Sequence, residues 1–147
     1  DFAARIQPLV AEVYPEASSD PQFAQRAGLI QDRITFFPEA PEMLSYYYSE
    51  PKADMELIAS KKQKLDAKLA KEVIELLIEK LEPFNDWNED ALKEFLFALA
   101  DEKELKKGQL LWPLRAILTG LPFSPGAFEV AAALGKEKTM QRLKKAV

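Results

Sequence analysis

The sequence predicts an all-α fold of eight or nine short helices. Apolar residues recur at spacings of three and four along most of the chain, and no segment shows the apolar/polar alternation of a half-buried strand. Signals for helix starts and stops follow one another closely, and no internal repeat is visible. The starts are at Asp20, Asn88 and Ser124, and the stops are at Gly120 and Gly135.

The N-terminal part predicts three helices in succession. Apolar residues between Phe2 and Val13 indicate a short amphipathic helix that ends at Tyr14-Pro15. Asp20 then suits the N-cap of a helix of about 13 residues, and Arg26 and Arg33 complement the dipole at its C-terminal end. A short helix rich in tyrosine ends at Pro51. Because the composition turns polar and lysine-rich from residue 52 to 64, we place a subdomain boundary there, with subdomains 1–60 and 61–147.

The second subdomain begins with a long helix over residues 65–81 and a helix capped by Asn88. Pro113 suits the first turn of the next helix, and Gly120 suits its left-handed end. Ser124 is expected as the following N-cap, with Pro125 at the first helical position. The last helix runs beyond Gly135, with Met140 and Leu143 directed inward and its basic residues, Arg142 among them, directed outward.

Residues 112–135 attract most of the functional interest. Free backbone N–H groups at the start of one helix and Arg115 near the end of the previous helix should form a small polar, cationic corner. Arg115 lies within an apolar run, so its guanidinium either pairs with a buried carboxylate or faces a ligand at the helix edge. Both alternatives stay open from the residues alone.

Composition narrows the classes of function. The chain of 147 residues contains neither cysteine nor histidine, which excludes disulfides, thiolate zinc sites and catalytic sites that need either residue. Glycine-rich phosphate loops and carboxylates within apolar runs are absent, so neither a cofactor, a metal site nor a catalytic residue is expected. No apolar run approaches the roughly 20 residues of a membrane span, and no signal-peptide pattern is present, so a cytoplasmic location is expected.

The charge is unevenly distributed. The net charge of −4 argues against a nucleic-acid partner, yet residues 103–147 carry nine basic and three acidic groups. A basic third in an acidic chain suggests an anionic partner at that end. The alternative is that these basic residues pair with the acidic remainder of the protein.

Tyr46, Tyr47 and Tyr48 have two interpretations. Aromatic side chains near arginines can stack on unpaired RNA bases. Three consecutive tyrosines on a helix cannot all face the same direction, however, so packing in the core is favoured for most of them.

Several motifs carry a resemblance to a known family. The strings PLRAILTG and SPGAFEVAAALGKEKTMQRLKKA resemble the C-terminal end of bacterial glutamyl-tRNA synthetases, whose pattern runs PLR-x-ALTG, a T/S-P-x-(L)-F turn and LGKE-x-x-x-RL. The similarity extends upstream to RAGLIQDRITFFPEAPEMLSYYYSEP and covers nearly the whole chain. The sequence departs from the pattern at Ala127, where leucine is frequent, and at Trp112, where glutamine is common.

The resemblance implies a two-subdomain α-helical cage that grips the anticodon loop of the tRNA for glutamate. Arg33 matches the family position that reads the third anticodon base and helps to reject the tRNA for glutamine. Arg115 lies beside the turn that holds the first anticodon base. That turn consists of Ser124, Pro125, Gly126 and Ala127, and the further candidate tRNA contacts are Trp112, Phe123, Lys136 and Lys138.

The resemblance covers only the anticodon-binding part of the enzyme. The chain has neither the family's His-x-Gly-His turn nor its Lys-Met-Ser-Lys-Ser loop. We therefore expect no activity from this chain alone, with ATP and Mg used by an upstream catalytic domain of the full-length enzyme. A different class of function is a stand-alone helical module for protein–protein interaction that uses the aromatic cluster. A small enzyme is nearly excluded by the missing residue types.

Overall fold

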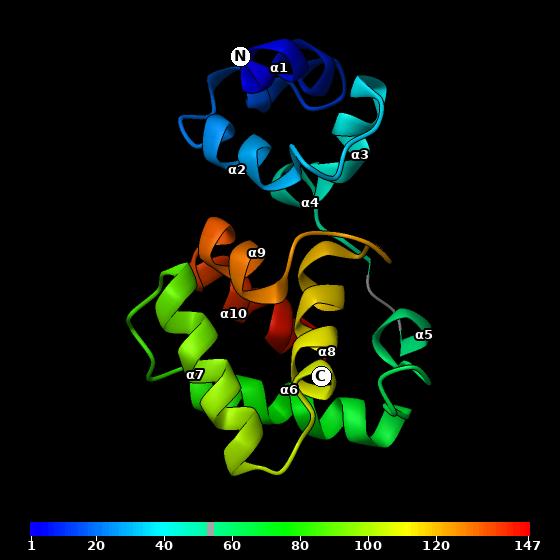
Figure 1. Cartoon of the computed structure of the whole chain (residues 1–147), viewed down its shortest axis with the longest axis vertical. Coiled ribbons are helices and arrows are strands. Elements are labelled where there is room, and N and C mark those ends of the chain that lie inside the picture. The colour runs from blue at the N-terminus through cyan, green and yellow to red at the C-terminus, as the bar shows by residue number, and fades with distance from the viewer. Residues whose placement is uncertain (53–54) are drawn as a thin grey trace. The chain divides into compact units, whose positions relative to one another are not determined.

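A computed structural model describes residues 1–52 and 55–147 (Figure 1). Within these residues the regular elements are helices, and the only extended pairing is an isolated bridge between Ser60 and Leu65. The all-α class predicted from the sequence is therefore confirmed. The chain forms two compact units, Asp1–Pro51 and Lys52–Val147, and each is described by itself.

The first unit consists of short helices around a small apolar core. Its first helix is amphipathic and ends before Tyr14-Pro15, as predicted, and Ile6 and Val10 on its inner face are fully buried. The first helix packs against the second and the third. The elements are α1 (Phe2–Val13), a 3-10 helix (Pro15–Ser19), α2 (Phe23–Ile30), a 3-10 helix (Phe37–Glu39), α3 (Ala40–Met43) and α4 (Ser45–Tyr48).

Helix α2 is shorter than the predicted helix. The carboxylate of Asp20 accepts the backbone N–H of Gln22 at 2.9 Å, and its carbonyl accepts the N–H of Phe23 at 3.2 Å. The chain therefore makes a turn after Asp20 before the helix begins at Phe23. The helix ends at Ile30, whose carbonyl accepts the N–H of Arg33 at 2.9 Å.

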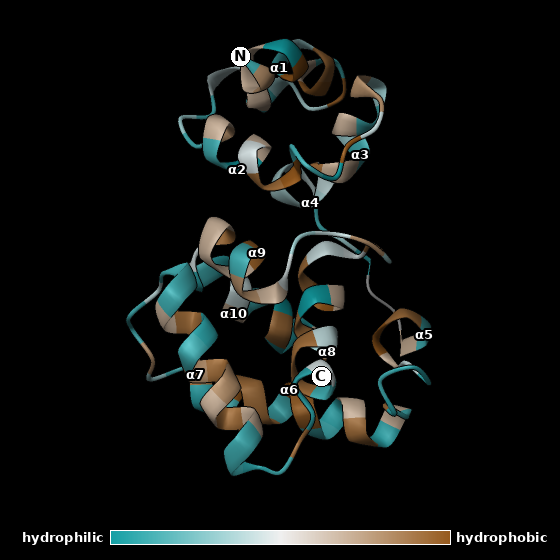
Figure 2. Cartoon of the chain, viewed as in Figure 1, coloured by the Kyte–Doolittle hydropathy of each residue, from teal (hydrophilic) through white to brown (hydrophobic). Residues whose placement is uncertain are grey.

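The second unit is a helical bundle with α8 at its centre. This helix contacts all the other helices of the unit, and its residues from Pro113 to Thr119 are all buried. Figure 2 shows hydrophobic (brown) and hydrophilic (teal) residues alternating along α6 and α7, as expected of amphipathic helices. The elements are α5 (Met55–Ile58), α6 (Ala67–Leu81), α7 (Glu89–Glu102), α8 (Lys107–Thr119), α9 (Ala127–Leu134) and α10 (Lys136–Lys145).

The units divide between Pro51 and Lys52, whereas the sequence suggests a boundary between residues 60 and 61. Helix α5 packs against α6 and α8 of the second unit. The indole N–H of Trp112 also donates to the carbonyl of Leu57 at 3.0 Å. The segment from Met55 to Ser60 thus belongs structurally with the residues that follow it.

Two further predicted helix starts are wrong, besides that of α2, although other signals are confirmed. Helix α8 begins at Lys107 rather than Pro113, because the Gln109 side chain accepts the N–H of Lys106 at 2.9 Å and satisfies an otherwise free donor. Helix α9 begins at Ala127, with Gly126 as its N-cap instead of Ser124. The predicted cap of α7 at Asn88 is present: its side chain accepts the N–H of Ala91 at 2.9 Å. The predicted left-handed residue after α8 is also present, as Gly120 has φ 67°.

Two arginines lie inside the units, contrary to prediction. Arg26 sits in the middle of α2 instead of at its C-terminal end, and its guanidinium pairs with Asp20 at 2.9 Å. Arg142 is expected to face outward on α10, yet it is only 4% exposed and donates to the carbonyl of Leu118 at 2.7 Å. In both cases a nearby oxygen compensates for the loss of water around the charge.

Candidate functional site

The predicted corner lies where α8 ends and the chain turns through residues 120–126 toward α9 (Figure 1). Arg115 is 8% exposed and directs its guanidinium into this turn. Its Nη1 donates to the carbonyl of Leu121 at 3.1 Å and to the hydroxyl of Ser124 at 2.9 Å, and its Nη2 donates to the carbonyl of Pro122 at 3.1 Å. Arg115 therefore fixes the shape of the loop from within.

The ring of Trp112 packs against the same guanidinium. Its centroid lies 4.4 Å from the Arg115 Cζ, a distance at which the ring face attracts a cation. Because the indole N–H is bonded to Leu57, the ring is held at both its apolar face and its polar edge. Trp112 thus supports Arg115 at the position where glutamine is common in the family pattern.

Thr119 and Gly120 complete the turn. The Thr119 hydroxyl donates to the carbonyl of Arg115 at 2.9 Å and accepts the N–H of Leu121 at 3.1 Å. The left-handed backbone of Gly120 lets the chain reverse without the steric penalty of a Cβ. The Ser124 hydroxyl, besides accepting from Arg115, donates to the carbonyl of Pro125 at 2.8 Å.

The surface of the loop is partly accessible. Phe123 is 87% exposed and is the most exposed large hydrophobic residue described in the chain. Ser124 and Gly126 are half-buried, whereas the side chains of Pro125 and Ala127 are buried. The four predicted turn residues therefore expose chiefly their backbone to solvent. The neighbouring Phe123 adds an exposed aromatic ring.

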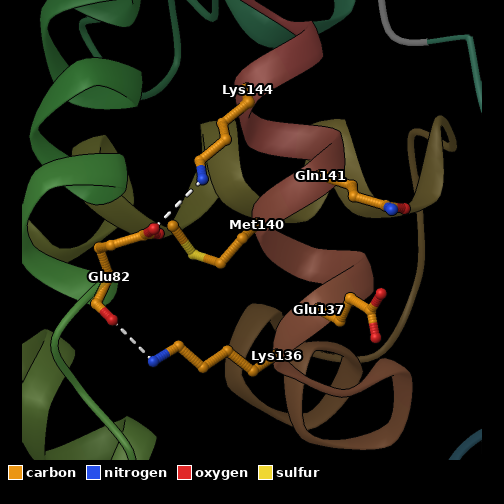
Figure 3. Close-up of a pocket in the computed structure, with 6 residues that line it drawn as sticks. All are labelled: Glu82, Lys136, Glu137, Met140, Gln141 and Lys144. Atoms are coloured by element: carbon orange, nitrogen blue, oxygen red, sulfur yellow. Dashed lines mark hydrogen bonds and ion pairs between the residues drawn. The ribbon is translucent and has the colours of Figure 1, made fainter.

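Lys136 and Lys138 lie at the start of α10. The Lys136 amine donates to the carbonyl of Glu82 at 2.7 Å and to the side chain of Asn85 at 2.9 Å, as Figure 3 shows for Glu82. In the same open hollow, Lys144 pairs with the Glu82 carboxylate at 3.3 Å. The alternative in which C-terminal basic residues pair with the acidic part of the chain therefore holds for Lys144, whereas the partners of Lys136 are a neutral carbonyl and a neutral amide. Lys138 is half-buried.

Arg33 belongs to the first unit and follows α2 directly. Its backbone N–H closes the turn at the end of that helix, and its side chain is exposed. Phe36, three residues later, is 67% exposed, whereas Phe37 packs edge-on against Phe2 with ring centroids 6.0 Å apart. Sequence reasoning missed Phe36 as a candidate. Its sequence signal is the adjacent pair Phe36-Phe37 in a connection between helices. A residue outside a helix has no buried helix face, so at least one of two adjacent aromatic rings there is expected to be exposed.

The tyrosine cluster is mostly core. Tyr46 and Tyr47 are buried, in agreement with the favoured interpretation. Tyr48 is half-buried, and its hydroxyl donates to the Asp20 carboxylate at 2.7 Å. Arg26 lies over the Tyr47 ring, 4.5 Å from its centroid. Buried rings cannot stack on bases, so Tyr46 and Tyr47 hold the first unit together.

Asp20 joins three groups at the start of α2. Burial alone would raise the pKa of its carboxyl, but the hydrogen bonds from Tyr48 and the Gln22 N–H, together with the charge of Arg26, lower that pKa below its usual value. Burial and the bond to Asp20 raise the pKa of Tyr48. The network is therefore a charged anchor for the first unit.

Two properties of the described residues concern other classes of site. No group of three acidic side chains within residues 1–52 and 55–147 is placed to hold a metal ion. In that same part of the chain, none of the helices has the length and apolar character needed to cross a membrane.

The motifs, the all-helical fold and the ordered corner are consistent with a known family of RNA-binding domains. A family model described as an anticodon binding domain matches residues 1–147. The chain belongs to this family. The resemblance stated from the sequence is thereby confirmed.

Curated relatives and a solved structure agree with this assignment. The glutamate–tRNA ligase of Clostridium novyi is 35% identical over 116 residues, which are 78% of this chain. That of Clostridium acetobutylicum is 33% identical over 117 residues, which are 79% of the chain. The chain spans about a quarter of the length of these relatives, 24% of each.

A crystal structure of a glutamate tRNA ligase from Elizabethkingia meningosepticum, in complex with its amino acid, has a similar fold. The TM-score is 0.78 at 26% sequence identity, and the match covers 99% of this chain and 29% of that one. The similarity therefore extends over both units of the anticodon-binding domain.

Proposed function

We propose that this chain recognises the anticodon of the tRNA for glutamate, as the anticodon-binding part of a glutamate–tRNA ligase, and contributes no chemistry of its own. The observation that carries the proposal is the loop 121–124, which Arg115 fixes through three hydrogen bonds while Phe123 remains 87% exposed. A rigid turn beside an exposed ring suits an unpaired base, because the base can stack on the ring and bond to the backbone. Membership of the anticodon-binding family supports the same partner.

In this proposal the turn of Ser124, Pro125, Gly126 and Ala127 holds the first anticodon base. Backbone N–H groups in the first turn of α9 have no partner within the helix and can donate to a base edge. Arg115 positions this turn from within. Trp112, in turn, supports Arg115, while Phe123 is the accessible aromatic surface.

Arg33 is proposed to read the third anticodon base, which is cytosine for glutamate and guanine for glutamine. The Watson–Crick edge of cytosine offers two adjacent acceptors, its O2 and N3, whereas the same edge of guanine offers one acceptor, O6, beside two N–H donors. A guanidinium has only donors, so it can form two parallel hydrogen bonds to cytosine, whereas on guanine at most one is possible and the remaining donors face each other. The backbone N–H of Arg33 is fixed by its bond to the Ile30 carbonyl, while the exposed side chain is free to reach a base.

The test compares anticodon stem-loops that differ only in the third base. The 147-residue chain should bind the glutamate stem-loop more tightly than the glutamine one, with affinity that falls as salt rises. Arg33→Gln should reduce this preference by roughly 5- to 150-fold, the equivalent of about 1–3 kcal/mol. Arg5→Gln, at another exposed arginine of the first unit, is the matched control. Equal preference in the wild type and in Arg33→Gln would rule out the assignment of Arg33.

The alternative function, a stand-alone protein–protein module, depended on the tyrosine cluster as an exposed surface. Tyr46 and Tyr47 are buried, so the cluster offers little area to a partner. Failure of the wild-type chain to bind either stem-loop at low salt would favour the protein–protein module over anticodon recognition.

A further inference from the structure

A group of lysines lies at the opposite end of α8 from the anticodon turn. One set is on the turn of residues 60–65, which is closed by the reciprocal bonds Ser60 N–H to Leu65 carbonyl at 2.9 Å and Leu65 N–H to Ser60 carbonyl at 2.8 Å. The other set is on the turn between α7 and α8 and on the first residue of α8. We call the group the two-turn lysine cluster; its members, all exposed, are Lys61, Lys62, Lys64, Lys103, Lys106 and Lys107.

The two turns are joined through one side chain. The amide nitrogen of Gln109 donates to the carbonyl of Lys64 at 3.1 Å, and its amide oxygen accepts the N–H of Lys106 at 2.9 Å. Lys64 also adopts a left-handed backbone, with φ 57°, which is uncommon for a residue with a long side chain. The protein thus uses a specific bridge to hold two lysine-bearing backbones together.

The resulting arrangement keeps like charges close together. The neighbouring Lys64 side chain lowers the pKa of Lys106, because two ammonium groups close together disfavour each other's charge. In the part of the chain that the structure describes, no ion pair joins these six lysines to a carboxylate. Carboxylates do occur in the same turns and helix ends, at Asp66, Asp101, Glu102 and Glu104, but the Asp66 oxygen accepts the Leu69 N–H at 2.8 Å as a helix cap.

We propose that the two-turn lysine cluster binds phosphate groups of the RNA backbone, at a contact separate from the anticodon turn. Lysine is a compact point charge that suits phosphate, and several lysines in one place attract a polyanion. A protein partner fits less well, because the cores of protein interfaces are depleted in lysine and enriched in aromatic residues. The inference rests on the proposed RNA-binding function and extends it to a second surface.

The distance between the anticodon turn and the two-turn lysine cluster sets the minimum length of an RNA that binds both. Helix α8 has 13 residues and a rise of about 1.5 Å per residue, so its two ends are roughly 20 Å apart. One nucleotide cannot span that distance. The partner must therefore be an RNA of several nucleotides, with a base at the C-terminal end of α8 and phosphates at its N-terminal end.

The test is a salt titration of binding to a tRNA transcript with the glutamate anticodon. The double variant Lys64→Gln/Lys106→Gln should lower the magnitude of the slope of log K against log salt by about 1–2, since each lost phosphate contact contributes about 0.7–0.9. The preference for the glutamate over the glutamine anticodon should not change. The control Lys71→Gln/Lys80→Gln removes the same charge from α6 and should leave the slope near its wild-type value.

The outcomes separate this inference from the proposed function. If the wild type binds with salt dependence and anticodon preference but Lys64→Gln/Lys106→Gln keeps the wild-type slope, the cluster is not a phosphate contact. Equal loss of slope in the α6 control would also overturn the inference, because the effect would then report overall charge. If the wild type itself fails to bind the transcript, the proposed function fails. Circular dichroism of each variant establishes that it is folded.

Discussion

Three oxygen atoms of the loop 121–124 bind the buried guanidinium of Arg115. At the scale of single residues, Arg115 therefore stabilises the loop of the site and does not itself face the ligand. Its planar fork reaches two carbonyls and a hydroxyl at once, which the single ammonium group of lysine cannot reproduce.

Arg115→Ala should lower the free energy of unfolding of the second unit by about 2–4 kcal/mol, because hydrogen bonds to a charged donor contribute about 1.5–3 kcal/mol each and are not additive. Arg115→Lys should give an intermediate loss. Urea unfolding followed by tryptophan fluorescence measures both, since the Trp112 ring contacts Arg115. Arg5→Ala, at an exposed arginine, is the control. A midpoint for Arg115→Ala equal to that of the control would show that the bonds to the loop add no stability.

Phe123→Ala should separate binding from stability. The ring is 87% exposed, so its removal should change the free energy of unfolding by less than about 0.5 kcal/mol. Loss of a stacked base should nevertheless weaken binding to the glutamate stem-loop by about 1–3 kcal/mol. Val13→Ala, at another exposed apolar residue, is the matched control and should leave binding unchanged. Unaltered affinity of Phe123→Ala would remove the ring from the site.

Local sequence indicates candidate site residues but not the direction of every side chain. Arg115 was noticed because it interrupts an apolar run, and the structure gives that cation a set of partners in the next loop. Arg26 and Arg142 gave no such signal, because their helices also carry exposed charges. Whether a charged side chain on an amphipathic helix faces inward depends on oxygens that other segments bring close, such as the Leu118 carbonyl.

At the scale of elements, the beginning of α2 depends on a carboxylate with three partners. Tyr48, the Gln22 N–H and Arg26 together lower the pKa of Asp20 in the folded chain. A lowered folded pKa stabilises the protein above the unfolded value of 3.8, and that contribution is lost as the pH falls through the folded pKa.

The wild-type chain should therefore lose more stability than Asp20→Asn between about pH 5 and pH 2. Asparagine cannot ionise, so the variant is less stable at neutral pH but lacks this contribution to acid sensitivity. Urea unfolding at several pH values measures the difference. Asp32→Asn, at an exposed carboxylate of the same unit, serves as a control. Parallel stability curves for the wild type and Asp20→Asn would contradict the role of the network.

The same substitution at two glycines should have opposite effects. Gly120 ends α8 with φ 67°, so Gly120→Ala should lower stability by about 1 kcal/mol. Gly28 lies inside α2, and a Cβ there meets nothing within 4 Å, so Gly28→Ala should raise stability by about 0.5–1 kcal/mol. Thermal unfolding measures both changes. If the two variants shift in the same direction, the conformational explanation is wrong.

Elements were predicted best where the signal was local. The Asn88 cap and the Gly120 stop depend on a few neighbouring atoms and are as the sequence indicates. The start of α8 was missed because proline is common in a first turn, whereas Pro113 lies well inside the helix. The hydroxyl of Ser124 suits a helix cap, but Arg115 and the Pro125 carbonyl bind that hydroxyl instead.

At the scale of the whole molecule, the proposed function assigns an anticodon base to a residue of each unit, Arg33 in the first and the loop 121–124 in the second. The uneven charge helps this, because residues 103–147 are basic although the whole chain has a net charge of −4. A ligand that binds only the folded state stabilises it by mass action.

The glutamate stem-loop at about 100 times its dissociation constant should therefore raise the free energy of unfolding by about 2.7 kcal/mol. The glutamine stem-loop at the same concentration should raise it less, because it leaves Arg33 unsatisfied. Differential scanning calorimetry of the chain with each RNA provides the comparison. Equal shifts with both RNAs would show that binding does not depend on the third base.

The sequence by itself determined the all-helical class, most helix positions, the family and the residues of the corner. These follow from periodicity, caps and motifs, which are properties of neighbouring residues. Only the tertiary structure decided that Arg115 fixes the loop, that the two buried tyrosines are Tyr46 and Tyr47, and that Gln109 joins two lysine-bearing turns. Each of these depends on atoms that are distant along the chain or supplied by a turn, and the free energy of burying a polar group depends on which partners the fold places beside it.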